Sequence, residues 1–390
     1  MRQPELPVVL HGGVFKKTAT VSEAVFIITG MTIGAGILGL PYVIARSGLA
    51  LGLILIALWG LVVLLLNLML GDIAVRTRQN FQLPGFAGKY LGKWAKHLLS
   101  VIIIFSGFGT LLAYIIGEGQ ALSEIFGGTP FWWSVFFWSL GSFFIWQGLQ
   151  TVKTIDRVLS LTVIVLIVAL STFLLPKINI EYVHYSNLAN FFLPFGVILF
   201  AMHATPAIAE AHALLPGSEK RFKKAIIIGT LIPIAVYLLF ALAVVGYFGL
   251  SVTEVATIGF GRAFGPGFII MANAFAVLAM GTCFMGMGLA LKQTFVWDHK
   301  LNPYLAEFAV VVVPLLLFLF GFRSFVEVLD VVGGLFIGLE SLLIVLICYV
   351  ARKKGDLDGS RYAFKNFWLA AVPVLIFFLV ATVYSVTKIF

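Results

Sequence analysis

Two short stretches of the sequence place helix-breaking residues and polar side chains inside otherwise apolar runs. The first is TIGAGILGLP at residues 32–41, and the second is FAMHATP at residues 200–206. Glycine weakens a helix interior by about 1 kcal/mol relative to alanine, and proline removes one backbone hydrogen bond and clashes one turn earlier. We therefore predict interrupted helices at 32–37 and at 200–206, where free backbone groups are available to bind a solute.

The free backbone groups at such breaks have opposite polarity, and together they suit a zwitterion. A helix that starts near Gly36 directs its unpaired N–H groups at the break and would bind a carboxylate. Helices that end near Thr32 and near Phe200 and Ala201 direct carbonyl oxygens at the same place, where they suit an ammonium group or a cation. One site that offers both kinds of group matches an amino acid.

The composition indicates that these breaks lie in a membrane. The chain has 390 residues, of which 61% are hydrophobic and 11% are charged. A soluble protein has about 45–50% apolar and about 25% charged residues. This composition excludes a soluble enzyme, a nucleic-acid binder and a disordered chain. The formal net charge of +9 lies in short gaps between apolar runs, as is typical of charges that set membrane topology.

Eleven apolar segments are long enough to cross a bilayer, since a spanning helix needs about 20 residues. They are residues 21–45, 48–74, 97–124, 130–149, 155–175, 188–215, 222–249, 260–291, 305–322, 325–350 and 366–388. If the N-terminus is cytoplasmic, all but five of the 26 lysines and arginines fall on the inner side. The five exceptions are Arg46, Lys177, Arg262, Arg323 and Lys388. We therefore predict an all-α polytopic plasma-membrane protein with its N-terminus inside and its C-terminus outside.

The positions of the two breaks indicate an internal repeat. Each break lies in the first helix of a five-helix half, and paired interruptions of this kind are typical of inverted-repeat secondary transporters. The expected organisation is a cytoplasmic tail at 1–20, a first repeat at 21–175, an inverted second repeat at 188–350, and an inner loop with the eleventh helix at 351–390.

The residues around both breaks resemble known transporter families. GAGILGLPY at 34–42, followed by SGL at 47–49, resembles the first helix of the amino acid/auxin permease family. FAMHATPAI at 200–208 resembles helix six of the related hydroxy and aromatic amino acid permeases, and IGTLIP at 228–233 is similar to their helix seven. Both groups belong to the amino acid–polyamine–organocation superfamily, so the resemblance implies a leucine-transporter-like 5+5 fold with broken helices one and six.

The resemblance also implies substrate-binding residues. It assigns contacts in helix one, helix three and helix six. These residues are Thr32, Gly34, Ala35, Gly36, Ile37, Tyr114, Phe200, Met202, His203 and Thr205. His203 also has a second interpretation, as a structural group that bonds the broken backbone of its helix.

The coupling ion is left open between Na⁺ and H⁺. The resemblance implies a Na⁺ site on the carbonyls of Gly30, Ile33 and Ala279 and on the hydroxyl of Thr282. Cys283 replaces the usual second hydroxyl and is a poor ligand for a hard cation. The lysine that some proton-coupled relatives carry in helix five is absent, because Thr162 and Val163 lie at that depth.

Three further polar residues are candidates for gating or proton coupling, namely Glu210, Glu118 and Arg46. Glu118 is predicted in the outer part of helix three, and Arg46 could pair with Glu327 or Asp330 as an outer gate. Ionisable side chains within a membrane are functional candidates by default.

These observations predict a permease that imports a neutral, aromatic or branched L-amino acid by alternating access, as a monomer without a cofactor. The alternatives are a channel, an intramembrane enzyme, or a carrier of another small solute such as a polyamine or organic cation. The sequence contains no HExxH, GxSxG or CxxC motif, which disfavours an enzyme.

Overall fold

The computed structural model describes residues 20–79, 81–147, 152–215, 218–358, 362 and 366–389, and this part of the chain is helical without strands. The first half contains α1 (Val21–Thr32), α2 (Gly36–Ser47), α3 (Leu49–Val75), α4 (Leu83–Tyr90), α5 (Lys93–Phe126), α6 (Pro130–Gln147), α7 (Val152–Leu174) and α8 (Ile180–His184). The second half contains α9 (Phe195–Ala201), α10 (Thr205–Leu214), α11 (Glu219–Phe248), α12 (Ile258–Phe264), α13 (Pro266–Gln293), α14 (Pro303–Leu319), α15 (Phe325–Val331), α16 (Gly338–Lys354) and α17 (Phe367–Ile389).

Every apolar segment that the sequence predicts contains at least one helix. Within the described residues, seven helical stretches are long and apolar enough to cross a membrane, and α1 with α2 forms an eighth, bent by 57°. The other three segments contain α6, α7 and α14. The number of eleven spans stays a prediction, because these three helices are not among the candidate spans. The predicted tail at 1–20 lies outside the described residues, except for Thr20.

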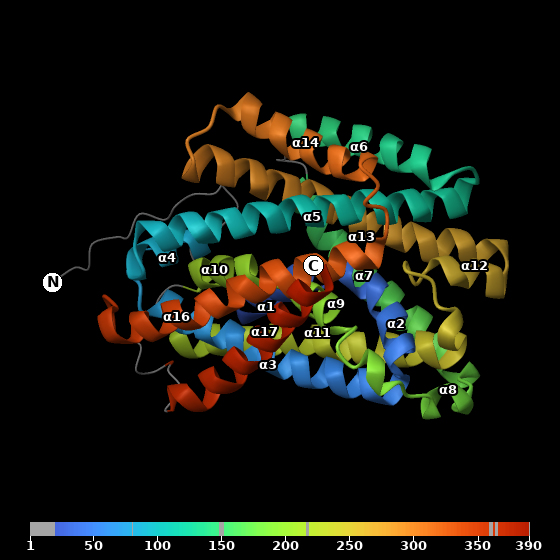
Figure 1. The fold of residues 1–390 in the computed structure, drawn as a ribbon, viewed down its shortest axis with the longest axis horizontal. Coiled ribbons are helices and arrows are strands. Elements are labelled where there is room, and N and C mark those ends of the chain that lie inside the picture. The colour runs from blue at the N-terminus through green and yellow to red at the C-terminus, as the bar shows by residue number, and fades with distance from the viewer. Residues whose placement is uncertain are drawn as a thin grey trace.

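The first described helix begins at a capping box. The Thr20 hydroxyl accepts the backbone N–H of Glu23, and the Glu23 carboxylate accepts the backbone N–H of Thr20. This reciprocal pair satisfies two donors that a helix start leaves free. The gaps between apolar segments at 75–96 and 176–187 contain the short helices α4 and α8, which lie at opposite ends of the bundle in Figure 1.

Both predicted breaks are present. In the first span the helix stops after Thr32 and restarts at Gly36, and in the sixth it stops after Ala201 and restarts at Thr205. Pro206 lies in the first turn of α10 rather than inside a helix. A proline is tolerated there because the N–H that it lacks would have no partner inside the helix.

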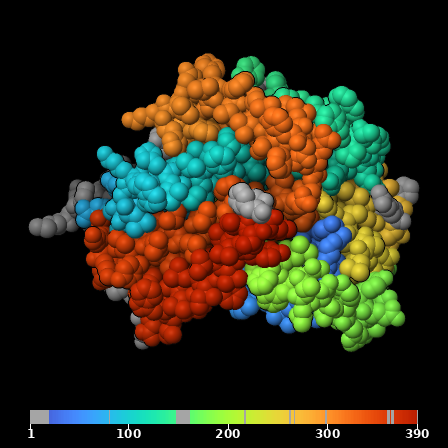
Figure 2. Space-filling model, in the orientation of Figure 1, coloured from blue at the N-terminus to red at the C-terminus, as the bar shows by residue number. Residues whose placement is uncertain are grey.

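A third irregular segment, in the tenth span, was not predicted. A π-helical segment, η5 (Val332–Ile337), separates α15 from α16. It contains Gly333, where an added Cβ would overlap the carbonyl of Gly196 in α9. On the face seen in Figure 2, the C-terminal helix α17 (red) packs against α16 and against η5. The tenth span is therefore held between the broken sixth span and α17.

Candidate functional site

The two broken spans touch each other at their breaks. A Cβ built on Gly36, the first residue of α2, would lie 2.5 Å from the Cα of Ala201, the last residue of α9. The start of α2 thus lies directly against the end of α9. The stretches 32–37 and 200–206, which the sequence predicts to form one site, are brought together.

A tyrosine of α11 joins the carbonyl ends of these helices. The hydroxyl of Tyr237 lies 2.7 Å from the carbonyl oxygen of Thr32 and 2.8 Å from that of Ala201. A tyrosine hydroxyl has one proton, so it donates to one carbonyl at a time. These carbonyls belong to the helix ends that the sequence predicts to face an ammonium group.

Tyr237 is absent from the residues predicted from sequence. It is fully buried in an apolar run, and a buried tyrosine hydroxyl usually finds a hydrogen-bond partner. That rule marks Tyr237 as a residue with a polar partner in the core. It does not identify the partner, because Thr32 and Tyr237 are 205 residues apart.

The third span and the eighth span meet the first break through Tyr114 and Cys283. The Tyr114 hydroxyl and the Cys283 thiol interact by a hydrogen bond. A Cβ built on Gly34 would lie 3.1 Å from the Cys283 sulfur. The predicted substrate-binding residue Tyr114 is therefore connected through Cys283 to the first break.

His203 lies in the break of the sixth span and bonds to the tenth span. Its Nε2 is 3.0 Å from Oε1 of Glu340, near the start of α16. The Glu340 side chain is 3% exposed, and that of His203 is 21% exposed. His203 therefore holds the two irregular spans together and also faces a small cavity, so the structural and site interpretations of this residue are compatible.

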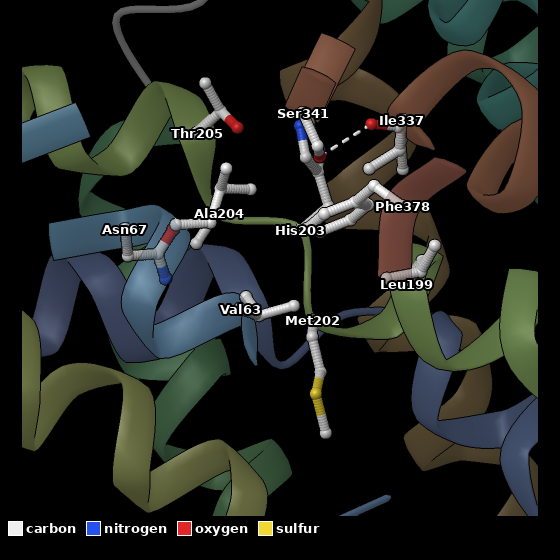
Figure 3. A pocket seen from close by; sticks show the side chains of 11 residues that line it. Val63, Asn67, Leu199, Met202, His203, Ala204, Thr205, Ile337, Ser341 and Phe378 are labelled. Carbon is white, nitrogen blue, oxygen red and sulfur yellow. Dashed lines mark hydrogen bonds between the residues drawn. The ribbon is translucent and has the colours of Figure 1, made fainter. Parts of the chain in front are cut away.

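The cavity beside His203 is small, and Figure 3 shows the side chains that line it. Its volume is about 10 Å³, close to the space of one water molecule. Met202 points away from His203 in the same view. The lining residues are Val63, Leu66, Asn67, Leu199, Met202, His203, Ala204, Thr205, Ile337, Ser341 and Phe378. An amino acid would fit here only if the surrounding helices moved apart.

Two of the predicted ion ligands, Ala279 and Thr282, are engaged within α13. The Thr282 hydroxyl donates to the carbonyl oxygens of Leu278 and Ala279, at 3.0 and 3.1 Å. Gly30 lies in the last turns of α1, and the N–H of Ile33 donates to the carbonyl of Thr29. In the described ranges, no group of three His, Cys, Asp or Glu side chains could hold a metal ion. The Na⁺ site stays a prediction.

The gating candidates lie in different places. Arg46 stacks over the ring of Tyr42, 3.3 Å from its centroid, and donates to the Tyr42 carbonyl. Asp330 instead pairs with Lys388 at 2.7 Å. Arg46, Glu327, Asp330 and Lys388 all line a second cavity of about 170 Å³ at the end predicted to face outside.

The remaining candidates are Glu210 and Glu118. Glu210 lies in α10. Glu118 lies in α5 and is fully buried, so it does not line the outer cavity. Both of its carboxyl oxygens lack a hydrogen-bond partner in the described part of the chain.

Solved structures of transporters share this fold. Over 96% of this chain and 100% of the other, the structure aligns with MhsT in complex with L-phenylalanine, at a TM-score of 0.66 and 16% identity. A manganese transporter of Eremococcus coleocola aligns over 98% of this chain and 90% of its own, at a TM-score of 0.69 and 12% identity. The leucine-transporter-like fold expected from the sequence is confirmed.

Curated relatives are similar over most of the chain. Glutamine transporter 2 of Aliivibrio fischeri is 25% identical over 349 residues, which are 84% of this chain and 88% of the relative. Tyrosine-specific transport system 1 of Haemophilus influenzae is 26% identical and covers 84% of this chain and 87% of its own. Such relatives carry amino acids and are not enzymes, as the sequence predicts.

The match to one family spans both breaks and nearly the whole chain. Residues 17–386 match the tryptophan/tyrosine permease family, a narrower group than the superfamily that the sequence motifs resemble. Together with the meeting of the two broken helices, this match establishes a transporter of amino acids. The chain belongs to the tryptophan/tyrosine permease family.

Proposed function

We propose that this permease imports a neutral aromatic L-amino acid by alternating access, driven by a coupled ion. The observation that carries the proposal is the meeting of opposite helix ends at Gly36, Thr32 and Ala201. One small region then offers the N–H groups of a helix start and the carbonyls of two helix ends. That combination suits the two charges of an amino acid backbone.

The binding mode follows from these polarities. The substrate carboxylate is placed at the start of α2, on residues 34–37. Its ammonium group is placed at the carbonyls of Thr32 and Ala201, where the hydroxyl oxygen of Tyr237 can accept a hydrogen bond from it. The side chain then extends toward Tyr114 and His203, with Phe200, Met202 and Thr205 beside it.

An aromatic side chain is favoured by the family and by two proteins of similar sequence or fold. The family is named for tryptophan and tyrosine, one relative is named for tyrosine, and MhsT was solved with L-phenylalanine. The relative named for glutamine makes a neutral polar amino acid the second candidate.

The two cavities fit a transport cycle. The cavity at His203 has room for about one water, whereas the outer cavity is about 170 Å³. We infer that the site opens by rocking of the helices around it, with the repeats proposed at 21–175 and 188–350 as the moving units. The proposed orientation in the plasma membrane keeps the N-terminus inside and the C-terminus outside.

Counterflow in proteoliposomes tests this function. The purified protein is reconstituted with unlabelled tyrosine, tryptophan, glutamine or leucine inside, and the entry of labelled tyrosine is followed. We expect internal tyrosine and tryptophan to accelerate entry strongly, and glutamine and leucine to do so weakly. This acceleration is expected because a carrier returns faster when loaded than when empty.

Three outcomes would contradict the proposal. Equal entry with and without internal amino acid would indicate a channel. Acceleration by glutamine alone would move the substrate class to neutral polar amino acids. Acceleration only by a polyamine would exclude the zwitterion site described above.

A further inference from the structure

Glu118 is a buried carboxyl group without a partner in the middle of the bundle. Its side chain is 0% exposed, and neither carboxyl oxygen has a hydrogen-bond partner among the described residues. The other buried acids of the spans differ from it. Asp72 pairs with Arg76, Asp330 with Lys388, and Glu340 with His203.

Three glycines, two beside Glu118 on α5 and one on α13, allow the helices to pack closely around its side chain. A Cβ on Gly117 would lie 2.5 Å from the Met280 sulfur of α13, and a Cβ on Gly119 would overlap Ser134 of α6. A Cβ on Gly281 of α13 would lie 3.3 Å from Oε1 of Glu118 itself. The close approach of α6 and α13 to α5 therefore excludes water from the carboxyl group.

Among the side chains that the structure describes, few titratable groups lie near this carboxyl, and none of them is basic. On α5 itself, Tyr114 lies one turn inward, and on α13 the nearest is the Cys283 thiol, two residues after Gly281. Helix α6 contains no ionisable residue. Helix α15 contacts this region through Phe325, and its Asp330 is paired with Lys388.

The physical consequence concerns the charge of Glu118. An ionised carboxylate without a partner or water is strongly disfavoured in a protein interior, and such a group takes up a proton instead. In this closed arrangement Glu118 is therefore a neutral carboxylic acid. Ionisable residues placed in this way within a membrane commonly belong to proton relays.

We propose that Glu118 carries the coupling proton of this transporter. It takes a proton from water on the outer side, holds it in the closed arrangement, and releases it to water on the inner side when movement of the first break against α13 admits water to the carboxyl group. The empty transporter returns with the carboxylate still in contact with this water, and the carboxylate regains a proton when the site faces outward again. This inference rests on the proposed function and names its ion as H⁺.

The position of Glu118 connects this proton to the substrate site. Tyr114, one turn along α5, interacts with Cys283, which faces Gly34 in the first break. The same part of α13 carries Ala279 and Thr282, the residues predicted to hold Na⁺. Substrate that shifts the first break against α13 would thus also change the packing around Glu118.

Proteoliposomes with separate ion gradients test the proposal. The wild type, Glu118→Gln and Glu340→Gln are compared, with Glu181→Gln in the exposed helix α8 as a matched control. The readouts are tyrosine counterflow and tyrosine accumulation under an inward proton gradient. An inward gradient of one pH unit supports up to about tenfold accumulation per proton. Infrared difference spectra of wild type against Glu118→Gln follow the carbonyl stretch of a protonated carboxylic acid.

We expect Glu118→Gln to keep counterflow but to lose accumulation, because glutamine matches the neutral acid in shape and cannot release a proton. We also expect the carbonyl band to disappear in this variant. Glu181→Gln should accumulate tyrosine like the wild type. Such a result would separate coupling from binding.

Several outcomes would overturn the proposal. One is accumulation of tyrosine by Glu118→Gln at the wild-type level. Another is accumulation by the wild type that requires Na⁺ and does not respond to the proton gradient. A third is loss of accumulation in Glu340→Gln while Glu118→Gln still accumulates tyrosine. If the wild type showed no counterflow of any aromatic amino acid, the proposed function itself would fail. That result is distinct from a loss of coupling with counterflow intact.

Discussion

At the scale of single residues, Tyr237 has the most direct effect on the two broken helices. Its hydroxyl lies within 2.8 Å of both carbonyls that end α1 and α9. Because it can donate to only one of them at a time, its bond can pass from one to the other as the helices shift. Tyr237 therefore couples the first span to the sixth while staying on α11.

Replacement of this tyrosine tests that role. We expect Tyr237→Phe to raise the KM for tyrosine uptake and to lower the melting temperature in detergent. The loss of one buried hydrogen bond should cost about 1–3 kcal/mol, because a buried carbonyl is left without its donor. Uptake kinetics and a thermal-shift assay measure the two effects.

Tyr247→Phe is the matched control, since Tyr247 lies on the same helix and packs by its ring against Phe248. It should behave like the wild type in both assays. Equal KM and melting temperature for Tyr237→Phe and the wild type would show that the hydroxyl has no role in the site.

At the scale of helices, contact between α2 and α9 depends on the absence of a side chain at Gly36. We expect Gly36→Ala to abolish most uptake, because its Cβ would meet the backbone of Ala201 at 2.5 Å. Alanine favours a helix by about 1 kcal/mol over glycine, so a loss of uptake could not come from helix propensity. Initial uptake rates, corrected for protein amount, measure the effect.

Gly286→Ala in α13 serves as the control, because a Cβ there has no heavy atom within 4 Å. This variant should transport normally. Normal uptake by Gly36→Ala as well would mean that the two breaks do not need to meet for transport.

The tenth span contacts the sixth span at more than one point along its length. The π segment η5 brings Gly333 against Gly196 and is followed by Glu340, which bonds His203. Such π segments often occur at functional sites. A π segment has no local sequence signature comparable to the glycine-rich first break, so the packing of the tenth span decides this irregularity.

At the scale of the whole molecule, an ionic cluster joins helices at the end predicted to be cytoplasmic. Asp356 follows α16, accepts from the ammonium of Lys89 in α4, and accepts the backbone N–H of Arg78 at 3.0 Å. Its own N–H donates to the carbonyl of Arg76. The hydrogen bond from Lys89 lowers the pKa of Asp356 below its ordinary value.

The sign of the pH effect follows from that direction. Since the carboxyl has a lower pKa in the folded protein, its bonds stabilise the cluster fully above the ordinary pKa and are lost as the pH falls through the lowered one. We expect Asp356→Asn to speed hydrogen exchange in α4 at neutral pH, and the wild type to approach the variant only in strong acid. Hydrogen exchange with mass spectrometry measures both.

Glu181→Gln, at the opposite end of the bundle, should leave exchange in α4 unchanged. Identical exchange in Asp356→Asn and the wild type at neutral pH would show that Asp356 does not hold α4. The side chains are partly exposed, so the expected effect on global stability is small.

The sequence by itself determined the membrane class, the apolar segments and the two breaks. These properties are local, because hydrophobic runs, glycine clusters and Pro206 act on the segment that contains them. The resemblance of the same residues to amino acid permeases then led to the fold and to the family. The predicted stretches 32–37 and 200–206 do meet, because both interruptions occur in the helices that form the centre of this fold.

The tertiary structure alone decided which distant groups complete the site. The bond of His203 to Glu340 joins residues 137 positions apart, and that of Tyr237 to Thr32 joins residues 205 positions apart. The isolation of Glu118 likewise depends on how α6 and α13 pack against α5. Such contacts depend on the packing of helices in three dimensions, which no local pattern encodes.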